Sequence, residues 1–180
     1  MRPEGIVGKP EVSMEYVTLV DAEDRVLGAA EKMKAHREAL LHRACSVVLF
    51  NERGEMLLQQ RNPTKYHSGG LWSNTCCTHP RPGESPADAA ARRLHEEMGM
   101  TADLRPAMEF VYRAEFADGL IEYEYDHVFV GRAVGPPQPD EAEVANWRWA
   151  SMEEVADDVV QHPSRYTRWF PLLLERLRNV

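Results

Sequence analysis

Hydrophobic and polar residues alternate along three stretches of this sequence, and each stretch predicts a β-hairpin. Residues 45–61 contain two apolar runs joined by a glycine-containing turn at 51–55, so we expect this strand pair at the centre of a sheet. Residues 109–134 are rich in Tyr, Phe and Val and turn back at 117–119. Residues 15–32 predict a third, shorter hairpin with its turn at 22–24.

Two further stretches predict single short strands. LWSNTCCTHP, residues 71–80, favours an extended backbone through its tryptophan, threonines and cysteines, and the strand should close at His79-Pro80. VANWRWA, residues 144–150, has the same preference. The proline-rich segment 135–143 is expected to be a connection without regular structure.

One internal helix has clear signals at both ends. Ser85 is a good N-cap residue, and Pro86 suits the first helical position, where a backbone N–H would have no partner. Good helix formers follow, and Gly99 stands where a left-handed C-cap favours the absence of a side chain. We therefore predict a helix over residues 86–98.

Helical patterns also close the chain. Ser151 and Glu154 have the spacing of a capping box, which predicts a helix beginning after Ser151. Pro163 separates this helix from a final apolar pattern over residues 164–180. Because proline in a helix interior removes a hydrogen bond and clashes with the preceding turn, we expect a break or kink at Pro171.

The order of these elements predicts one α/β sandwich. Strands lie on both sides of a single internal helix, further helices end the chain, and no internal repeat or linker is visible. A chain of 180 residues suits one domain with a substantial core. We place this domain at residues 14–180 and expect residues 1–13 to be a disordered extension, because they lack the apolar core of a signal peptide.

Composition narrows the functional classes. The chain is 43% hydrophobic and 28% charged, as in ordinary soluble globular proteins. A formal net charge of −8 argues against a nucleic-acid partner but leaves room for a local basic pocket. The 3 cysteines, two of them adjacent, make a poor disulfide framework and indicate reduced thiols in the cytoplasm. No apolar run approaches the length of a membrane span.

The strand at 71–80 places a thiol and an imidazole side by side. Successive side chains of a strand point to opposite faces, so Cys77 and His79 share one face while Cys76 and Thr78 share the other. Only one of the two adjacent thiols can then share a pocket with the histidine. We expect that thiol to be Cys77, and we expect Cys76 to pack as a small buried hydrophobe.

Several other side chains have the character of metal ligands. Three imidazoles and a pair of carboxylates two residues apart on one strand face would suit magnesium or a divalent transition metal: His36, His42, His79, Glu122 and Glu124. Taken singly, each histidine could instead be a surface residue or a hydrogen-bonded polar residue. The adjacent carboxylates Glu96 and Glu97 could bind metal or form an ordinary solvated helix face.

Basic and aromatic residues leave two interpretations open. As a group, Arg and Lys side chains could hold a diphosphate through guanidinium forks and ammonium groups, or they could be surface charge: Lys32, Arg61, Lys65 and Arg93. Tyr112, Trp72 and Trp169 could be core aromatics or could face a cation in a pocket. Sequence spacing alone does not choose between these alternatives.

The helix and its approach resemble the Nudix family, whose box is written G-x5-E-x7-R-E-U-x-E-E-x-G-U with U aliphatic. Seven positions match: Glu84, Arg92, Leu94, Glu96, Glu97, Gly99 and Met100. Two positions depart, because Thr78 replaces the first glycine and Arg93 replaces the first glutamate of the R-E pair. The second departure removes a carboxylate with which Nudix hydrolases hold magnesium. The resemblance implies an α/β (α+β) fold, a single-domain Nudix-like α/β/α sandwich with a mixed β-sheet.

The same departures, together with NTCCTHP, GGLWSN and the E-Y-E at 122–124, are similar to type 1 isopentenyl-diphosphate isomerase over residues 15–180. This resemblance implies catalytic roles for Cys77 and Glu124, assisted by Tyr112. It implies a metal site at His36, His42, His79, Glu122 and Glu124, with Glu97 helping to bind Mg²⁺ and the substrate diphosphate. It also implies a substrate-binding set that consists of Lys32, Arg61, Lys65, Arg93 and the cation-facing Trp169.

The implied reaction moves a double bond from isopentenyl to dimethylallyl diphosphate. It requires one proton to be added and another removed through a carbocation-like state, so two proton carriers are needed. We expect Glu124, near Tyr112, to deliver a proton, the Cys77 side to remove one, and Trp169 to shield the cation.

The cofactors expected from the resemblance are Mg²⁺ and a second divalent ion at the His/Glu site, which could be Mn²⁺, Zn²⁺ or Mg²⁺. The expected partner is the small-molecule diphosphate alone, bound by a cytoplasmic monomer or weak homodimer, without nucleic acid or membrane. Two alternatives stand beside the isomerase: a Nudix pyrophosphohydrolase, which would need the missing carboxylate from elsewhere, and a non-catalytic Nudix-like binding module.

Overall fold

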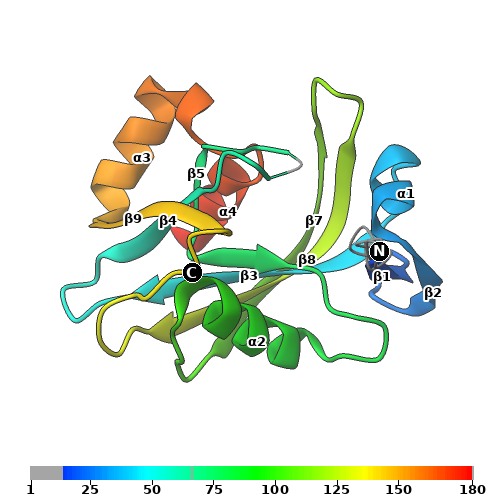
Figure 1. The fold of residues 1–180 in the computed structure, drawn as a ribbon, viewed down its shortest axis with the longest axis horizontal. Coiled ribbons are helices and arrows are strands. Elements are labelled where there is room, and N and C mark those ends of the chain that lie inside the picture. The colour runs from blue at the N-terminus through cyan, green and yellow to red at the C-terminus, as the bar shows by residue number, and fades with distance from the viewer. Residues whose placement is uncertain (1–13, 66, 180) are drawn as a thin grey trace, which may run out of the picture.

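The computed structural model describes residues 14–65 and 67–179, so the prediction for residues 1–13 lies outside the described residues. Within them, a sheet of 9 strands separates two layers of helix. Figure 1 shows α2 (Pro86–Met98) on one side of the sheet and α3 (Met152–Gln161) and α4 (Phe170–Leu177) on the other. The short helix α1 (Lys32–Arg37) lies at one end of the sheet. The predicted α/β/α sandwich is confirmed.

The central strand is β3 (His42–Phe50). It pairs in parallel with β8 (Ile121–Arg132), and this register sets His42 opposite Glu124. Its other partners, all antiparallel, follow one another along its length: β1 (Tyr16–Val20), β6 (Cys76–Thr78) and β4 (Met56–Arg61). The parallel pair makes the sheet mixed, and it brings the two halves of the chain together at His42.

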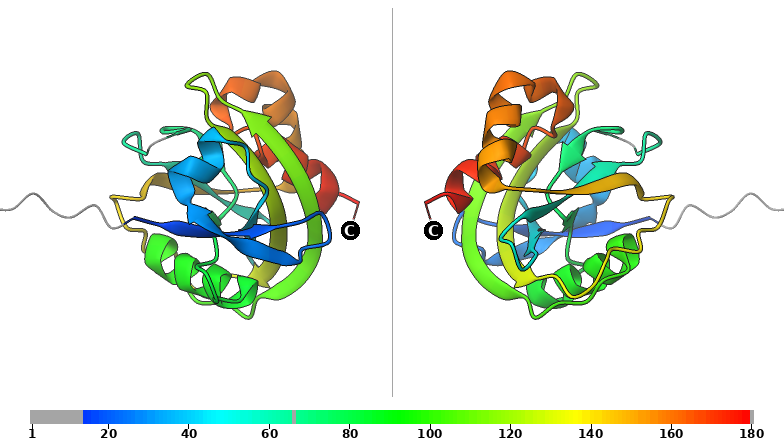
Figure 2. Two further views of the ribbon diagram at one scale, coloured as in Figure 1. Left: turned by 90° about the vertical axis from the view of Figure 1, so that its right-hand side faces the viewer. Right: turned by 90° about the vertical axis from the view of Figure 1, so that its left-hand side faces the viewer.

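The remaining strands extend this centre. β2 (Val26–Glu31) pairs with β1, and β7 (Arg105–Glu115) pairs with β8. β5 (Trp72–Ser73) and β9 (Val144–Ala150) both pair with β4. Figure 2 shows the long β7–β8 hairpin curving from the α2 side of the molecule to the α3 and α4 side. All three predicted hairpin regions therefore form strands around the expected turns.

Strand alternation divides the core between the two faces. Val47 and Leu49 of β3 pack with Leu94 of α2 on one face. Val48 between them belongs to the other cluster, with Phe170 and Leu173 of α4. Burial of these apolar faces on both sides of β3 fixes its orientation, because a shift by one residue would exchange the two sets.

The ends of α2 are as predicted. Ser85 Oγ accepts the Asp88 N–H at 3.1 Å, Pro86 occupies the first turn, and Gly99 has a positive φ of 61°. A Cβ at Gly99 would also lie 2.4 Å from the Gln138 carbonyl oxygen. Glycine is therefore required both by the left-handed cap and by the close approach of the chain before β9.

Two local predictions are corrected. The strand expected at 71–80 is divided into β5 and β6, because the Thr75 hydroxyl accepts the Leu49 N–H and donates to the Leu57 carbonyl, so side-chain bonds replace ladder bonds. The break or kink expected at Pro171 is wrong: Pro171 lies in the first turn of α4, where the N–H that proline lacks would have no helical partner. A 3₁₀ turn at Pro163–Arg165 separates α3 from α4, as Pro163 suggests.

Among the helices of the described residues, none has both the length and the apolar content required to span a bilayer.

Candidate active site

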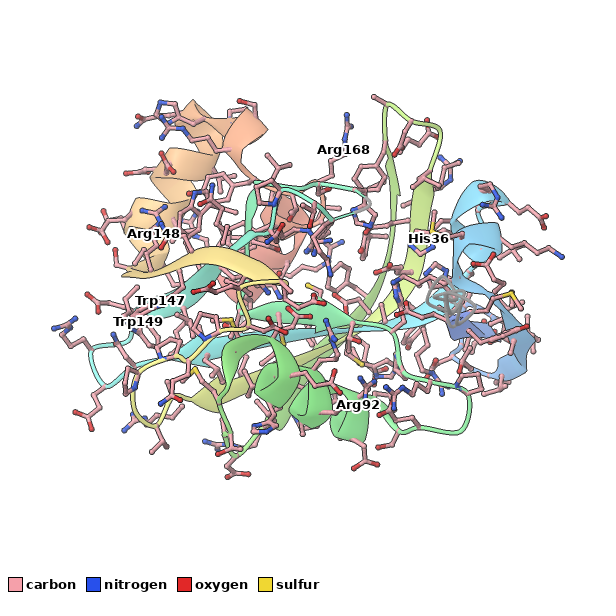
Figure 3. All side chains as sticks on the ribbon, in the orientation of Figure 1. His36, Arg92, Trp147, Arg148, Trp149 and Arg168 are labelled. Atoms are coloured by element: carbon pink, nitrogen blue, oxygen red, sulfur yellow. The ribbon has the colours of Figure 1, made fainter. Side chains whose placement is uncertain are left out.

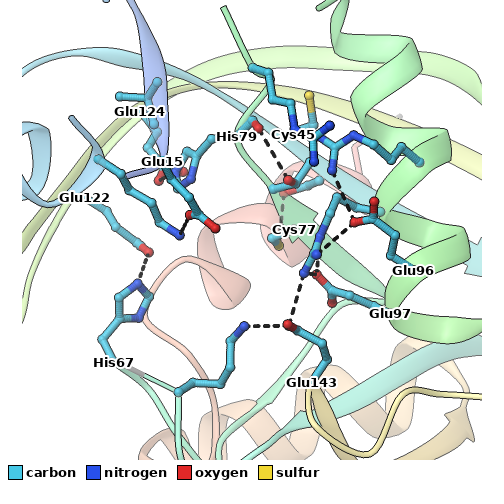
Figure 4. A pocket seen from close by; sticks show the side chains of 18 of the residues that line it. Glu15, Cys45, His67, Cys77, His79, Glu96, Glu97, Glu122, Glu124 and Glu143 are labelled. Atoms are coloured by element: carbon cyan, nitrogen blue, oxygen red, sulfur yellow. Dashed lines mark hydrogen bonds and ion pairs between the residues drawn. The ribbon is translucent and has the colours of Figure 1, made fainter. Parts of the chain in front are cut away.

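A pocket of about 540 Å³ gathers the candidate residues. It is lined by residues of β1, β3, β6, α2 and the β7–β8 hairpin, with Trp169 just before α4. Every residue of the implied catalytic, metal-binding and substrate-binding sets lines it except His36 and His42, whose ring centroids lie 5.4 and 4.9 Å from that of His79. Trp72 does not line the pocket; its ring lies under the Arg148 guanidinium instead. In Figure 4, Glu122, Glu124 and His67 stand on one side of the pocket, and Glu96, Glu97 and Glu143 on the other.

The two adjacent thiols have the environments that strand alternation predicts. Cys77 lines the pocket with His79, whereas Cys76 is fully buried in the apolar cluster beneath α2. Burial raises the pKa of Cys77 to about 12, so its resting form is the neutral thiol. The Ser46 hydroxyl lies 3.6 Å from Cys77 Sγ and donates at 2.7 Å to Asp126, a buried carboxyl whose pKa burial raises to about 7.

All three predicted histidines and one of the predicted glutamates form a compact group. One potential ligand atom from each of His36, His42, His79 and Glu124 lies within 4.8 Å of the others. Figure 3 shows His36 on α1, on the side that faces β8. His36 Nδ1 donates to the Lys32 carbonyl at 2.8 Å, and His42 Nδ1 donates to the Leu40 carbonyl at 2.8 Å. These bonds direct each Nε2 lone pair inward, as second-shell bonds do for metal-ligating histidines, so the donor set fits a divalent cation.

The fifth predicted ligand, Glu122, lies in a second and overlapping group. Its carboxylate groups with His36 and His67, and His67 Nε2 lies 3.2 Å from Glu122 Oε1. His67 also stacks on Phe116 with ring centroids 4.9 Å apart. Burial lowers the pKa of His67 to about 3, so this imidazole is neutral. Sequence reasoning missed His67, because a lone histidine in a glycine-rich loop carries no periodic signal.

Tyr112 connects the two carboxylates. Its hydroxyl donates at 2.6 Å to Glu124 Oε2 and lies 3.2 Å from Glu122 Oε2. Burial and the neighbouring Glu124 raise the pKa of Glu122, whereas contacts with His79 and His42 outweigh burial and hold the pKa of Glu124 low. Two close carboxyls rarely ionise together, so Glu122 keeps a proton and Glu124 is the ionised member. Burial lowers the pKa of His79 to about 4, which leaves this ring neutral.

Three of the predicted diphosphate-binding cations have acidic partners, and two of them, Arg93 and Lys65, lie on the Glu97 and Glu143 side of the pocket. Arg93 Nη2 lies 2.5 Å from Glu97 and 3.1 Å from Glu143, and Lys65 Nζ lies 2.5 Å from the same Glu143. Lys32 Nζ lies 2.7 Å from Glu15. Arg93 and Glu97 are four residues apart on α2 and share a helix face, whereas Glu143, in a proline-rich connection, had no sequence signal.

Trp169 closes the apolar part of the pocket. Its side chain is 3% exposed, and the Arg61 guanidinium carbon lies 5.4 Å from the indole centroid. The ring of His67 meets it edge-on at 5.9 Å. Of the two interpretations of Trp169, the geometry favours an aromatic face in a polar pocket over a purely core residue.

Comparison with known proteins agrees with this geometry. A model of the NUDIX domain matches residues 40–170. The isopentenyl-diphosphate Delta-isomerase of Burkholderia multivorans is 53% identical over 162 residues, which are 90% of this chain and 92% of that protein. The isopentenyl-diphosphate Delta-isomerase 2 of Aromatoleum aromaticum is 50% identical over 91% of this chain and 86% of that protein.

Solved structures agree on the fold. The crystal structure of DR0079 from Deinococcus radiodurans has a TM-score of 0.77 at 19% identity, with 90% of this chain and 98% of that chain covered. At that identity the likeness concerns the fold alone, and the sequence relatives carry the assignment. The chain belongs to the isopentenyl-diphosphate Delta-isomerase family, which is built on the NUDIX domain.

Proposed function

We propose that this protein interconverts isopentenyl and dimethylallyl diphosphate by proton transfer through a carbocation-like state. In the forward direction a proton is added to the terminal methylene carbon and another is taken from C2, so the double bond moves and the atoms balance. The observation that carries this proposal is one pocket in which a neutral thiol, Cys77, and an ionised carboxylate, Glu124, both face the space beside the basic residues.

Cys77 and Glu124 are then the two proton carriers, and Tyr112 holds the Glu124 carboxylate by its 2.6 Å hydrogen bond. Each turnover leaves both carriers in the opposite protonation state. In the forward direction Glu124 delivers the first proton and becomes ionised, and Cys77 removes the second and becomes a neutral thiol. The form with a neutral thiol is therefore the one that can react with dimethylallyl diphosphate in the reverse direction. A proton must therefore return from Cys77 to Glu124 between forward turnovers.

The basic residues bind the diphosphate. Arg93 and Lys65 are held close to each other by Glu143, so two cations are already gathered where phosphate oxygens would arrive. Arg61 adds a third positive group beside Trp169. Trp169 covers the hydrocarbon end and excludes water, which would otherwise capture the cation.

Two divalent ions complete the proposal. One ion, which could be Mn²⁺, Zn²⁺ or Mg²⁺, would be held by the group of His36, His42, His79 and Glu124. Glu122 would join these ligands by a movement of its carboxylate. Glu97 would hold Mg²⁺ that arrives with the diphosphate. When bound, these ions neutralise negative charge and polarise the groups that contact them.

Hydrolysis is the alternative that the pocket disfavours. Arg93 stands where a Nudix hydrolase would have a glutamate, and its guanidinium contacts Glu96 and Glu97. A cation in this position repels the additional metal charge that a hydrolase needs. The same cation can still bind the diphosphate of the substrate.

One incubation tests the proposal. Purified protein with Mg²⁺ and isopentenyl diphosphate should form dimethylallyl diphosphate and release no phosphate. Phosphate release without isomerisation would support the pyrophosphohydrolase, and binding without any turnover would support the non-catalytic module.

We further propose a cytoplasmic monomer or weak homodimer. Light scattering across a concentration series is the direct measurement of the oligomeric state.

A further inference from the structure

Asn74 lies between β5 and β6, and its side chain is fully buried. Its amide nitrogen donates to the Val47 carbonyl at 3.1 Å and to the Cys76 carbonyl at 2.9 Å. Both partners are carbonyl oxygens, which can only accept hydrogen bonds. A flip of the Asn74 amide would therefore lose both hydrogen bonds. The side-chain oxygen of Asn74 is consequently fixed in the opposite direction, toward the pocket wall.

That single oxygen has three donors around it. It accepts from Ser73 Oγ at 2.9 Å, from Cys77 Sγ at 3.2 Å and from Trp169 Nε1 at 3.3 Å. Cys77 and Trp169 come from distant parts of the chain, and in the proposed function they act on the same cation. Asn74 itself does not line the pocket among the described residues, so it does not reach the substrate.

We propose that Asn74 is a positioning residue that fixes the Cys77 thiol relative to the Trp169 ring. The inference rests on the proposed function, because it assumes that the thiol exchanges a proton beside a cation that the indole covers. A buried indole N–H and a buried thiol each need an acceptor, and sharing one rigid oxygen ties their positions together. Loss of this oxygen would let both groups shift, and a misplacement of about 1 Å at a reacting centre can cost on the order of 100-fold in rate.

A purely structural role is the competing explanation, and the neighbouring Thr75 provides a matched control. Thr75 is also fully buried, and its hydroxyl also bonds to two backbone groups, the Leu49 N–H at 2.9 Å and the Leu57 carbonyl at 2.8 Å. Its hydrogen bonds reach neither Cys77 nor Trp169. Thr75→Val therefore removes comparable buried hydrogen bonds from the same loop without touching the proposed link.

Three variants test the proposal: Asn74→Leu removes the acceptor at similar volume, and Thr75→Val is the control. Asn74→Asp keeps an acceptor oxygen and, as the protonated carboxyl that burial favours, can still donate to one of the two carbonyls that Asn74 bonds. Asn74→Leu should lower kcat by about 100-fold and change KM by less than about threefold, because the diphosphate contacts lie elsewhere. Asn74→Asp should recover at least about tenfold of that loss in kcat. Thr75→Val should lower the thermal midpoint with kcat within about threefold of the parent protein.

A spectroscopic measurement follows the link directly. In protein labelled with 5-fluorotryptophan, the Trp169 fluorine resonance, assigned with Trp169→Phe, should shift or broaden in Asn74→Leu and stay in place in Thr75→Val. Equal losses of kcat in these two variants, or a Trp169 resonance unmoved by Asn74→Leu, would overturn the positioning role. Absence of turnover in the parent protein would instead refute the proposed function, and the fluorine comparison would still decide whether Asn74 holds the indole. Asn74→Leu could fail to fold, and Asn74→Asp then provides the test. If Asn74→Asp is as stable as the parent protein but its kcat falls by about 100-fold, the positioning role is also overturned.

Discussion

Replacing each adjacent cysteine with serine should separate packing from chemistry. Cys76 is fully buried among apolar side chains including Leu94, so a serine hydroxyl there would lack a partner and cost about 1–3 kcal/mol of unfolding free energy. For a protein of this size about 1 kcal/mol corresponds to roughly 2–4 °C, so the thermal midpoint should fall by about 2–12 °C. The chemistry should remain within a few-fold of the parent protein.

Cys77→Ser should have the opposite profile. Serine can keep the hydrogen bonds to Asn74 and Ser46, so the thermal midpoint should change little. A hydroxyl is a far weaker acid than a thiol, and a positioned acid or base contributes about 10²–10⁴-fold to rate, equivalent to about 3–5 kcal/mol of activation free energy. kcat should therefore fall by at least about 100-fold at saturating isopentenyl diphosphate.

The assay measures turnover by formation of dimethylallyl diphosphate and stability by calorimetry for both variants. Cys45→Ser is a useful third variant, because Cys45 also lines the pocket but donates to the Pro86 carbonyl at 3.3 Å. An inactive Cys76→Ser beside a fully active Cys77→Ser would refute both the strand register and the assignment of the thiol. Full activity in both would remove the thiols from the mechanism.

Three other perturbations have defined outcomes. Arg93→Glu replaces a diphosphate-binding guanidinium by a carboxylate. The loss of a charge-assisted hydrogen bond should raise the substrate Kd at least about tenfold, and phosphate release should stay undetected. Robust phosphate release would favour the hydrolase. His79→Ala should reduce the divalent-metal content of protein purified without chelator, as measured by elemental analysis, and a full complement of metal would exclude His79 as a ligand. A hydrogen bond from Tyr166 lowers the pKa of Asp158 from its ordinary 3.8, so this carboxylate stabilises the fold above that value and the stabilisation is lost as pH falls through the folded pKa. Asp158→Asn should therefore lower the thermal midpoint at neutral pH by an amount that shrinks as pH falls below 3.8; a constant difference would contradict this linkage.

Elements set by local chemistry were predictable from the sequence. The caps of α2 depend on Ser85, Pro86 and Gly99, whose effects lie within a few residues, and the structure begins and ends the helix where they indicate. Strand alternation also separated Cys76 from Cys77, because the two faces of a strand differ whatever the strand packs against. The fold class was accessible for the same reason, since it follows from the order of such elements.

Features set by tertiary contacts were not predictable in this way. Pro171 was expected to interrupt a helix, but where α4 begins depends on how Phe170 enters the core. His67 reaches Glu122 only because its loop folds back over the β7–β8 hairpin, and no spacing in the sequence records that path. Asp126, two residues after Glu124 on the same strand face, could have been found by extending the alternation that identified Glu122. The catalytic and ligand roles of the site residues stay predictions until the variants are measured.

The parallel pairing of β3 with β8 has a consequence for how the chain folds. His42 and Glu124 face each other across this pairing although they are 82 positions apart in the sequence (124 − 42). Contacts between such distant segments carry a large loop-closure cost and form late, whereas the hairpins and α2 can form from near neighbours. We therefore expect the histidines to meet Glu124 late in folding, so that an ion bound by all of them would not guide the earlier steps. A divalent ion at the proposed site would stabilise this register once it has formed, but the pairing itself would have to form before the ion binds.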